Sequence, residues 1–353
     1  MIKRLFNRND NIAILIAGIF SIIIGLGVAR FAFTGLIPAM LDDYLTIKFV
    51  GILASLNFAG YLSGSIFSIF VKDINFKVYL YRFGIFLAIS TTFILAYSDN
   101  NTLWMVGRVL AGFAGAMCLI VGTSIVMQKL TIKSKTKAMG IHFSGIGFSI
   151  LTTDLLARFV LSLNYSWRDS WAVLAVFAII LSFYSVYILS FDKEVKQNAV
   201  KVKFDISIFT PFVIVLIIAY FTEGVGFVVQ ATFLPDIINN LKGLEGYGSL
   251  TWTLVGVAGI PSCIIWMLLA HRFGSSNIII IALLLQAVGI LIPAFSSNIY
   301  LNLLSGVLYG GTFIGLVALF MNLGGQLSRG NPVVLMGAMT SSYGIGQVIA
   351  PLY

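Results

Sequence analysis

Long apolar segments recur along the whole chain, and short polar stretches separate them. A helix needs about 20 apolar residues to cross the hydrocarbon layer of a membrane, which is about 30 Å thick. The pattern therefore predicts eleven membrane-spanning helices, which we number as spans 1 to 11 in chain order. They cover residues 12–40, 47–71, 79–97, 103–128, 137–161, 171–191, 210–234, 248–270, 276–296, 299–325 and 332–353.

The composition supports this interpretation. Hydrophobic residues make up 59% of the chain and charged residues 10%, whereas an ordinary soluble domain has about 25% charged residues. So few charges cannot cover the surface of a water-soluble protein of 353 residues. The predicted fold class is an all-α integral membrane protein. The first apolar run is too long for the 7–15-residue apolar region of a signal peptide, so we interpret it as a span.

The basic residues lie mostly on one side of the predicted spans. Sixteen of the 22 lysines and arginines fall on the side of the N-terminus: Lys3, Arg4, Arg8, Lys72, Lys77, Arg82, Lys129, Lys133, Lys135, Lys137, Lys193, Lys196, Lys201, Lys203, Arg272 and Arg329. Three fall on the other side: Lys48, Arg168 and Lys242. Cytoplasmic loops carry such an excess. We therefore expect a multi-pass protein of a bacterial-type inner membrane, with its N-terminus in the cytoplasm.

Single cysteines test this orientation. Lys135→Cys and Lys201→Cys are expected to react with a membrane-impermeant thiol reagent only from the cytoplasmic side, where the charge excess places them. Asp99→Cys and Lys242→Cys are expected to react only from the outside. Labelling of intact cells and of inverted vesicles measures both. Reaction of Lys201→Cys from the outside would overturn the charge count and the repeat described next.

The two groups of spans resemble each other at an offset of 197 to 199 residues. Gly27 and the segment 36–38 in span 1 correspond to Gly224 and the segment 233–235 in span 7. Six spans separate the matched members, so both halves have the same orientation, as in the parallel repeats of some transporters. The predicted domains are an N-terminal six-helix half at 1–191, a cytoplasmic linker at 192–209 and a C-terminal half at 210–353. A counterpart of span 6 would fall near 369–389, so we expect that the twelfth span is missing.

The chain resembles the major facilitator superfamily of transporters, and within it the YbfB/YjiJ-type branch. The residues that carry the resemblance are Gly25 to Phe31 with Pro38, Gly107-Arg108 with Ala111-Gly112, His142 to Gly147, Trp167-Arg168 with Trp171, Thr232 to Pro235, and Gly346-Gln347 with Pro351. The resemblance implies two six-helix halves that move a solute by alternating access. It also implies that spans 1, 4, 7 and 10 line a central cavity and that spans 3, 6 and 9 face lipid.

Five ionisable residues stand out among those inside predicted spans, where a charge at the membrane centre costs about 2.5–3.5 kcal/mol or more. They are Arg30, Arg108, Asp154, Arg158 and Glu223, in spans 1, 4, 5 and 7. Asp154 and Arg158 are four residues apart with the acid first, which predicts an ion pair along one helix. At about 1.5 Å per residue, Arg30, Arg108, Asp154 and Glu223 fall in one layer toward the outer side.

We interpret these charges as candidates for substrate binding or coupling. If Asp154 and Arg158 neutralise each other, Arg30 and Arg108 face Glu223 alone, and the excess positive charge favours a small organic anion or an amphipathic metabolite. Glu223 is then the candidate proton carrier, since burial favours its protonated form and a nearby arginine its carboxylate. Further candidates are the polar mid-span residues Asn57, Tyr61, Gln230 and Tyr309, which fit helix-to-helix hydrogen bonding equally well.

The sequence therefore predicts a secondary active transporter, proton-coupled and monomeric, whose partners are a small-molecule substrate, protons and the lipid bilayer. The main alternative is a proton-linked exporter of amphipathic cations. A membrane-embedded enzyme and a non-transporting fragment are further alternatives, although the chain has no catalytic motif such as His-Glu-x-x-His or Gly-x-Ser-x-Gly. We expect no cofactor, no metal and no nucleic acid.

Overall fold

The computed structural model describes residues 6–71, 73–131, 135–190, 209–327 and 332–352, with the backbone alone for 135–137 and 332–334. These residues form helices joined by short turns, which confirms the predicted all-α fold class. The predicted linker lies outside the described residues except for Phe209. So do Lys3, Arg4, Lys72, Lys133 and Arg329.

Two predicted spans contain a π-helical segment. Span 1 consists of α2 (Asn11–Ile22), the π-helical η1 (Ile23–Phe31) and α3 (Ala32–Leu41). Span 4 consists of α6 (Asn101–Ala116), the π-helical η2 (Met117–Val121) and α7 (Gly122–Lys129). The other N-terminal spans are α4 (Ile47–Phe70), α5 (Ile74–Tyr97), α8 (Lys135–Ser162) and α9 (Trp167–Ile188).

The C-terminal spans are unbroken α-helices. They are α10 (Pro211–Asn239), α11 (Tyr247–Phe273), α12 (Ser275–Phe295), α13 (Ile299–Leu327) and α14 (Pro332–Ile349), which the short 3₁₀ turn η4 (Ala350–Leu352) follows. Among the described residues, ten spans are long and apolar enough to cross a membrane. The eleventh predicted span corresponds to α14, which is not among those ten and packs against α10, α4 and α13.

Spans 3 and 6 begin about one helical turn earlier than the apolar pattern predicts. The Asp73 carboxylate accepts a hydrogen bond from the backbone N–H of Phe76 at 2.7 Å, which starts α5. At α9, Ser166 and Asp169 form a reciprocal capping box. Capping hydrogen bonds satisfy the free N–H groups of a first turn. These two helices therefore begin within polar residues, which a prediction based on apolar residues does not include.

Span 7 ends later than predicted. The helix α10 passes through Pro235 and continues to Asn239. The Asn239 side chain then accepts hydrogen bonds from the backbone N–H groups of Gly246 and Gly248, at 3.1 and 2.9 Å. Gly246 has φ 86°, a conformation that glycine adopts without steric cost. The turn after α10 is therefore fixed by its own hydrogen bonds rather than by Pro235.

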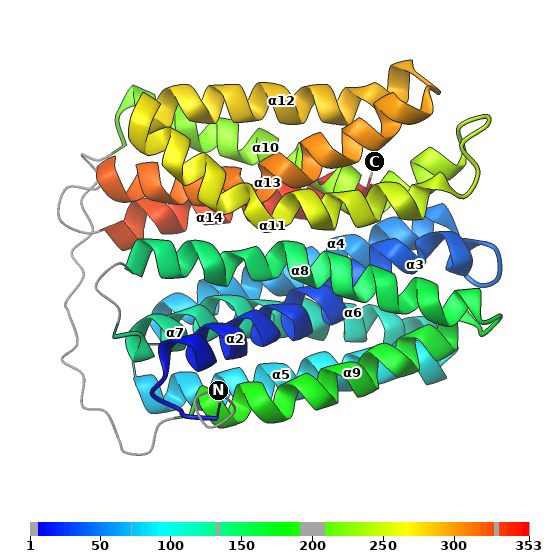
Figure 1. The fold of residues 1–353 in the computed structure, drawn as a ribbon, viewed down its shortest axis with the longest axis horizontal. Helices are drawn as coiled ribbons and strands as arrows, with labels where there is room; N and C mark the ends of the chain where they lie inside the picture. Colours follow the sequence, from blue (N-terminus) through cyan, green and yellow to red (C-terminus); the bar gives the residue numbers. More distant parts are fainter. Residues whose placement is uncertain (1–5, 72, 132–134, 191–208, 328–331, 353) are drawn as a thin grey trace.

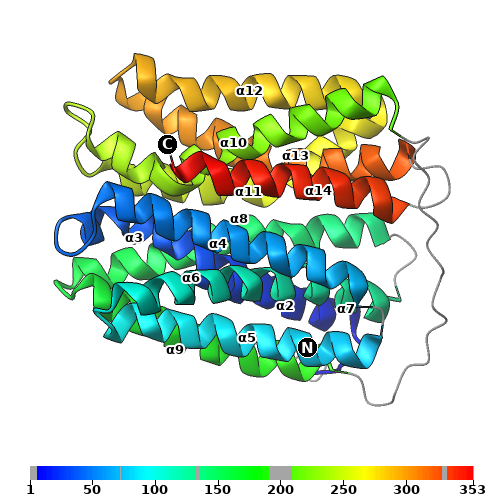
Figure 2. The same ribbon diagram turned by 180° about the vertical axis from the view of Figure 1, so that it is seen from behind.

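The two halves pack together through two long helix pairs. Figure 1 shows α11 lying along α8, and Figure 2, from behind, shows α14 lying along α4. Glycines allow close approach in both pairs: a side chain at Gly147 of α8 would meet the backbone of Ile260 on α11, and one at Gly344 of α14 would meet the Leu62 side chain of α4. Small residues at such crossings are usual in membranes, where dispersion contacts drive association.

The spans that the resemblance implies to be lipid-facing expose large apolar side chains. Phe86 of α5 is 63% exposed, Phe183 of α9 is 73% exposed and Leu284 of α12 is 63% exposed. Large exposed apolar side chains on several helices are typical of lipid contact in a membrane protein. The chain's two cysteines, Cys118 and Cys263, are both buried, so they contribute little background to the labelling test above.

Candidate functional site

The π-helical part of span 1 lies against spans 4 and 5 at two glycines. A side chain at Gly25 would collide with Cys118 of η2, and one at Gly27 would meet Ser149 of α8 at 3.0 Å. The Ser21 hydroxyl donates to the Cys118 carbonyl at 2.8 Å, which fixes the two spans beside each other. π-helical segments recur at functional sites, and η1 carries Arg30 in its last turn.

Aromatic rings from both halves surround the Arg30 guanidinium. Its central carbon lies 4.3 Å from the centre of the Phe58 ring and 5.1 Å from that of Tyr61, both on α4. Phe31 follows at 5.6 Å and Phe227, on α10 of the other half, at 5.7 Å. These distances are within the range of cation–π attraction. Arg30 is 9% exposed, so the rings replace most of its water.

The rings leave part of the guanidinium without hydrogen bonds. Nε and Nη2 of Arg30 are both buried, and neither has a hydrogen-bond partner among the described residues. Rings interact with the flat faces of a guanidinium, whereas its N–H groups point outward in its plane. A buried donor without a partner costs about 1–3 kcal/mol, and more when it is charged. The arrangement therefore favours an acceptor at the edge of Arg30.

Glu223, in the C-terminal half, is also buried with a polar atom that lacks a hydrogen-bond partner among the described residues. It is 4% exposed, and its Oε1 accepts a hydrogen bond at 3.3 Å from Gln286 of α12. The Gln286 carbonyl oxygen in turn accepts a long hydrogen bond from Thr312 of α13, at 3.5 Å. The second carboxyl oxygen, Oε2, is buried without a partner among the described residues.

Two tyrosines connect the environments of Arg30 and Glu223. The Phe227 ring, 5.7 Å from the Arg30 guanidinium, lies 6.0 Å from the ring of Tyr309 on α13 and 5.9 Å from that of Tyr343 on α14. Tyr343 also stacks on Tyr220 of α10, with ring centres 4.5 Å apart. Arg30 and Glu223, from spans 1 and 7, therefore belong to one buried cluster, which we call the aromatic site: Arg30, Phe58, Tyr61, Tyr220, Glu223, Phe227, Tyr309 and Tyr343.

Arg108 is buried beside span 1 and hydrogen-bonds to backbone. Its Nη1 donates to the Ala29 carbonyl at 3.0 Å and its Nε donates to the Leu53 carbonyl at 3.4 Å. The guanidinium lies 4.3 Å from the centre of the Phe33 ring. Its described partners all belong to spans 1 and 2, so Arg108 ties these two spans to span 4.

Asp154 and Arg158 lie within ion-pair distance, at 3.9 Å between Nη1 and Oδ2. Thr253 of α11 joins them: its hydroxyl donates to Asp154 and accepts a 2.8 Å hydrogen bond from Arg158. The pair therefore reaches across to the other half. The Asp154 side chain is 1% exposed, whereas that of Arg158 is 39% exposed.

The other predicted polar residues bind backbone carbonyls of neighbouring helices. Asn57 donates to the Arg108 carbonyl at 3.1 Å, Gln230 to Ile290 at 3.3 Å and the Tyr309 hydroxyl to Phe227 at 3.0 Å. These contacts correspond to helix-to-helix hydrogen bonding. Tyr61 contributes its ring to the aromatic site.

Four aromatic members of the site were not predicted from the sequence, and neither was Thr253; the four are Phe58, Tyr220, Phe227 and Tyr343. The chain contains 29 phenylalanines and 14 tyrosines, and most of them face lipid or the core without a distinguishing pattern. A spacing of three residues between Phe58 and Tyr61 places both on one helix face. That spacing alone does not indicate a partner on another helix.

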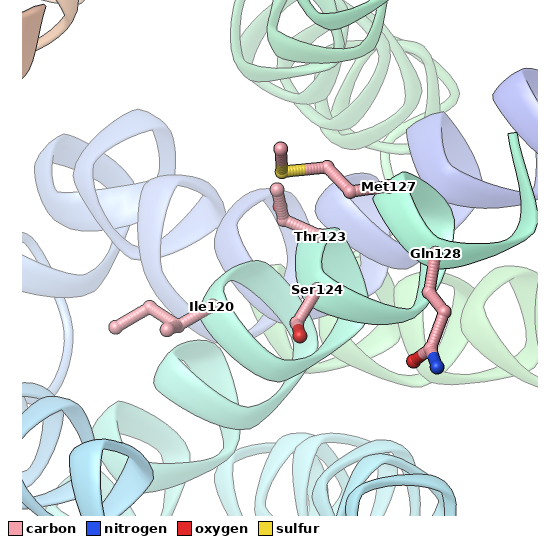
Figure 3. A pocket seen from close by; sticks show the side chains of 5 residues that line it. All are labelled: Ile120, Thr123, Ser124, Met127 and Gln128. Atoms are coloured by element: carbon pink, nitrogen blue, oxygen red, sulfur yellow. The ribbon is translucent and has the colours of Figure 1, made fainter. Parts of the chain in front are cut away.

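A pocket of about 430 Å³ lies on the half of span 4 that leads to Lys129. Its lining comes from η2 and α7: Ile120, Thr123, Ser124, Met127 and Gln128 (Figure 3). A neighbouring helix holds one polar lining residue in place, because Lys77 of α5 donates a hydrogen bond to the Ser124 hydroxyl at 2.9 Å. Thr123 also hydrogen-bonds at 2.8 Å to the Nε2 atom of the buried His142.

Comparison with known proteins gives a family match over nearly the whole chain. Residues 22–353 match the family described as "Uncharacterised MFS-type transporter YbfB". The match confirms the resemblance to the YbfB/YjiJ-type branch of the major facilitator superfamily.

Solved transporter structures share the fold at low sequence identity. A D-xylose-proton symporter superposes with a TM-score of 0.71 at 11% identity, over 96% of this chain and 88% of that one. A point mutant of the nucleoside transporter NupG gives 0.70 at 13% identity, over 98% and 90%. A bacterial homolog of the human lysosomal transporter Spinster, in an inward-facing and unoccupied conformation, gives 0.69 at 14%, over 97% and 81%. At these identities the likeness shows the fold alone.

Proposed function

Because this chain belongs to the family of MFS-type transporters described as YbfB, we propose that it moves a small organic anion across the membrane by alternating access, coupled to protons. The transporter family and its fold point to a secondary transporter rather than to a membrane-embedded enzyme. We further propose that it acts as a monomer in a bacterial-type inner membrane, with its N-terminus in the cytoplasm.

One observation carries the proposal: Arg30 and Glu223, from opposite halves, are buried in the same aromatic site with polar atoms that lack partners among the described residues. A solute bound there contacts both halves, so its binding is linked to their relative position. Two arginines against one carboxylate leave an excess of positive charge in low dielectric, which favours an anionic guest. Glu223, with its Oε2 available, is the group that takes up a proton.

The cation-exporter alternative has one observation in its favour. Glu223 follows Tyr220 by one turn of α10, and Tyr343 stacks on Tyr220 at 4.5 Å; a buried carboxylate in such aromatic surroundings also suits an amphipathic cation. In that case Glu223 binds the substrate directly and Arg30 is structural. Uptake of radiolabelled anions and of a lipophilic cation into proteoliposomes, with and without a pH gradient, separates the two functions. Folded protein that moves neither kind of solute supports the non-transporting alternative.

The two buried arginines are expected to respond differently to alanine substitution. Arg30→Ala removes a cation whose Nε and Nη2 have no acceptor among the described residues, so anion binding falls strongly while stability changes little. Arg108→Ala removes two hydrogen bonds to the Ala29 and Leu53 carbonyls, so stability falls by about 1–3 kcal/mol. Thermal unfolding of the purified proteins and equilibrium binding measure the two effects separately. If Arg30→Ala prevents insertion into the membrane, Arg30 is structural and the anion site is wrong.

A further inference from the structure

We propose that the solute is an aromatic monocarboxylate, whose carboxylate binds the edge of the Arg30 guanidinium and whose ring packs among Phe58, Tyr61 and Phe227. This inference names the substrate class and rests on the proposed function for the location of the site.

The two unpaired nitrogens of Arg30 indicate which chemical group of a solute would bind there. Nε–H and one N–H of Nη2 point in the same direction along one edge of the planar guanidinium, and these two nitrogens have no partner in the part of the chain that the structure describes. Two parallel N–H groups match the two oxygens of one carboxylate. The nearest described ring, Phe58, lies with its centre 4.3 Å from the guanidinium carbon and has no oxygen to accept from these N–H groups. A bound acceptor therefore approaches in the plane of the guanidinium.

The surrounding charges limit the solute to one carboxylate. Arg108, the second buried arginine, already donates to the Ala29 and Leu53 carbonyls. Among the described members of the aromatic site, Arg30 alone is a cation with unpaired donors, so a second carboxylate on the solute would be buried without a charged partner, which is costly. The arrangement therefore selects against dicarboxylates.

The rings beyond Arg30 indicate what the rest of the solute is. Phe227 packs against Phe58 of the other half with ring centres 6.4 Å apart at 83°, and against Tyr309 at 6.0 Å. Phe31 meets Phe313 and Trp252 across the same interface, at 6.4 and 6.2 Å. Edge-to-face and offset contacts between rings contribute about 0.5–1.5 kcal/mol beyond the area they bury. An aromatic ring on the solute can make the same kind of contact with these side chains, in place of the ring contacts that they make with each other across the two halves.

Equilibrium binding to purified protein is the appropriate measurement, because protonated aromatic acids cross lipid bilayers by themselves. The probes are benzoate, cyclohexanecarboxylate, benzamide and phthalate. Cyclohexanecarboxylate keeps the charge without the aromatic ring, benzamide keeps the ring without the charge, and phthalate adds a second carboxylate. Benzoate is expected to bind roughly 2- to 12-fold more tightly than cyclohexanecarboxylate. Benzamide and phthalate are expected to bind more weakly than both.

Three variants and a control assign the effects to named side chains. Arg30→Gln is expected to weaken benzoate binding by roughly 30-fold or more, and Arg30→Lys, which keeps the charge but lacks the paired N–H groups, by less. Phe58→Leu is expected to abolish the preference for benzoate over cyclohexanecarboxylate. Phe20→Leu is the matched control, since this partly buried ring on α2 packs against Tyr184 and belongs to no part of the aromatic site. Thermal unfolding establishes that each variant is folded.

Several results would overturn the inference: equal binding of benzoate and cyclohexanecarboxylate, unchanged benzoate binding in Arg30→Gln, or no benzoate binding by folded protein at millimolar concentration. The proposed function fails separately. Arg30-dependent, proton-driven uptake of a non-aromatic anion such as lactate would preserve the function and reject the substrate class. Arg30-dependent benzoate binding without any proton-driven uptake would preserve the site and reject the coupling.

Discussion

Transport by Glu223→Gln is expected to lose its dependence on pH while the protein remains folded and inserted. Glutamine has the same shape as protonated glutamate and keeps an acceptor for the Gln286 amide, which donates to Glu223 Oε1 at 3.3 Å. It cannot release a proton, so a cycle that depends on protonation of this residue loses its driving force. Initial rates of solute uptake into proteoliposomes, measured over a range of internal and external pH, test this directly.

Glu245→Gln is the matched control for that experiment. Glu245 lies in the exposed turn between α10 and α11, where its carboxylate accepts a hydrogen bond from the Gly243 N–H at 3.1 Å. The substitution makes the same chemical change outside the spans, so the pH profile of transport is expected to stay that of the unaltered protein. Normal transport with an unchanged pH profile in Glu223→Gln would contradict the coupling role.

Much of the fold follows from the sequence because one strong constraint governs it. Each crossing of the hydrocarbon layer needs a long apolar helix with all its backbone hydrogen bonds made internally. The apolar pattern therefore locates the spans within a few residues. The errors fall where polar residues decide the ends, as at Asp73 and Ser166, since capping depends on hydrogen bonds and not on hydropathy.

The site is less predictable because it depends on contacts between distant spans. The cost of burying a charge singles out Arg30, Arg108 and Glu223, yet it does not indicate their partners. Arg108 turns toward the Ala29 carbonyl, whereas Arg30 turns toward rings of both halves. No spacing within one helix distinguishes these outcomes.

The π-helical segments were also not predictable. Span 1 has glycines at 25 and 27 within η1, while span 7 has glycines at 224 and 226 in an unbroken α-helix. Glycine therefore permits the π-helical conformation without requiring it. The difference lies in the neighbours, because Gly25 of span 1 packs directly on Cys118 of the other π-helical segment.

Adding a single methyl group at Gly256 of α11 is expected to impair transport severely. A Cβ atom there would lie 2.7 Å from the backbone nitrogen of Leu151 and 3.0 Å from its Cα, both on α8 of the other half. Backbone atoms of a helix cannot rotate away as a flexible side chain does, so α8 and α11 must separate. Overpacking of this kind costs about 1–3 kcal/mol. If the closely packed arrangement of α8 and α11 is a step of the transport cycle, Gly256→Ala should lower the transport rate by about 5- to 150-fold.

The matched control is Gly311→Ala on the neighbouring helix α13. A Cβ atom at Gly311 would meet only Ala258 among the described residues, at the ordinary contact distance of 3.9 Å, and alanine is the better helix former. Its transport rate is therefore expected to equal or slightly exceed that of the unaltered protein. The atoms nearest to a Cβ at Gly256 all belong to Leu151 of the other half, so both variants are expected to insert and fold. Proteoliposome uptake and thermal unfolding measure the two properties. Normal transport by folded Gly256→Ala would show that the halves do not need the close contact of α8 and α11 during the cycle.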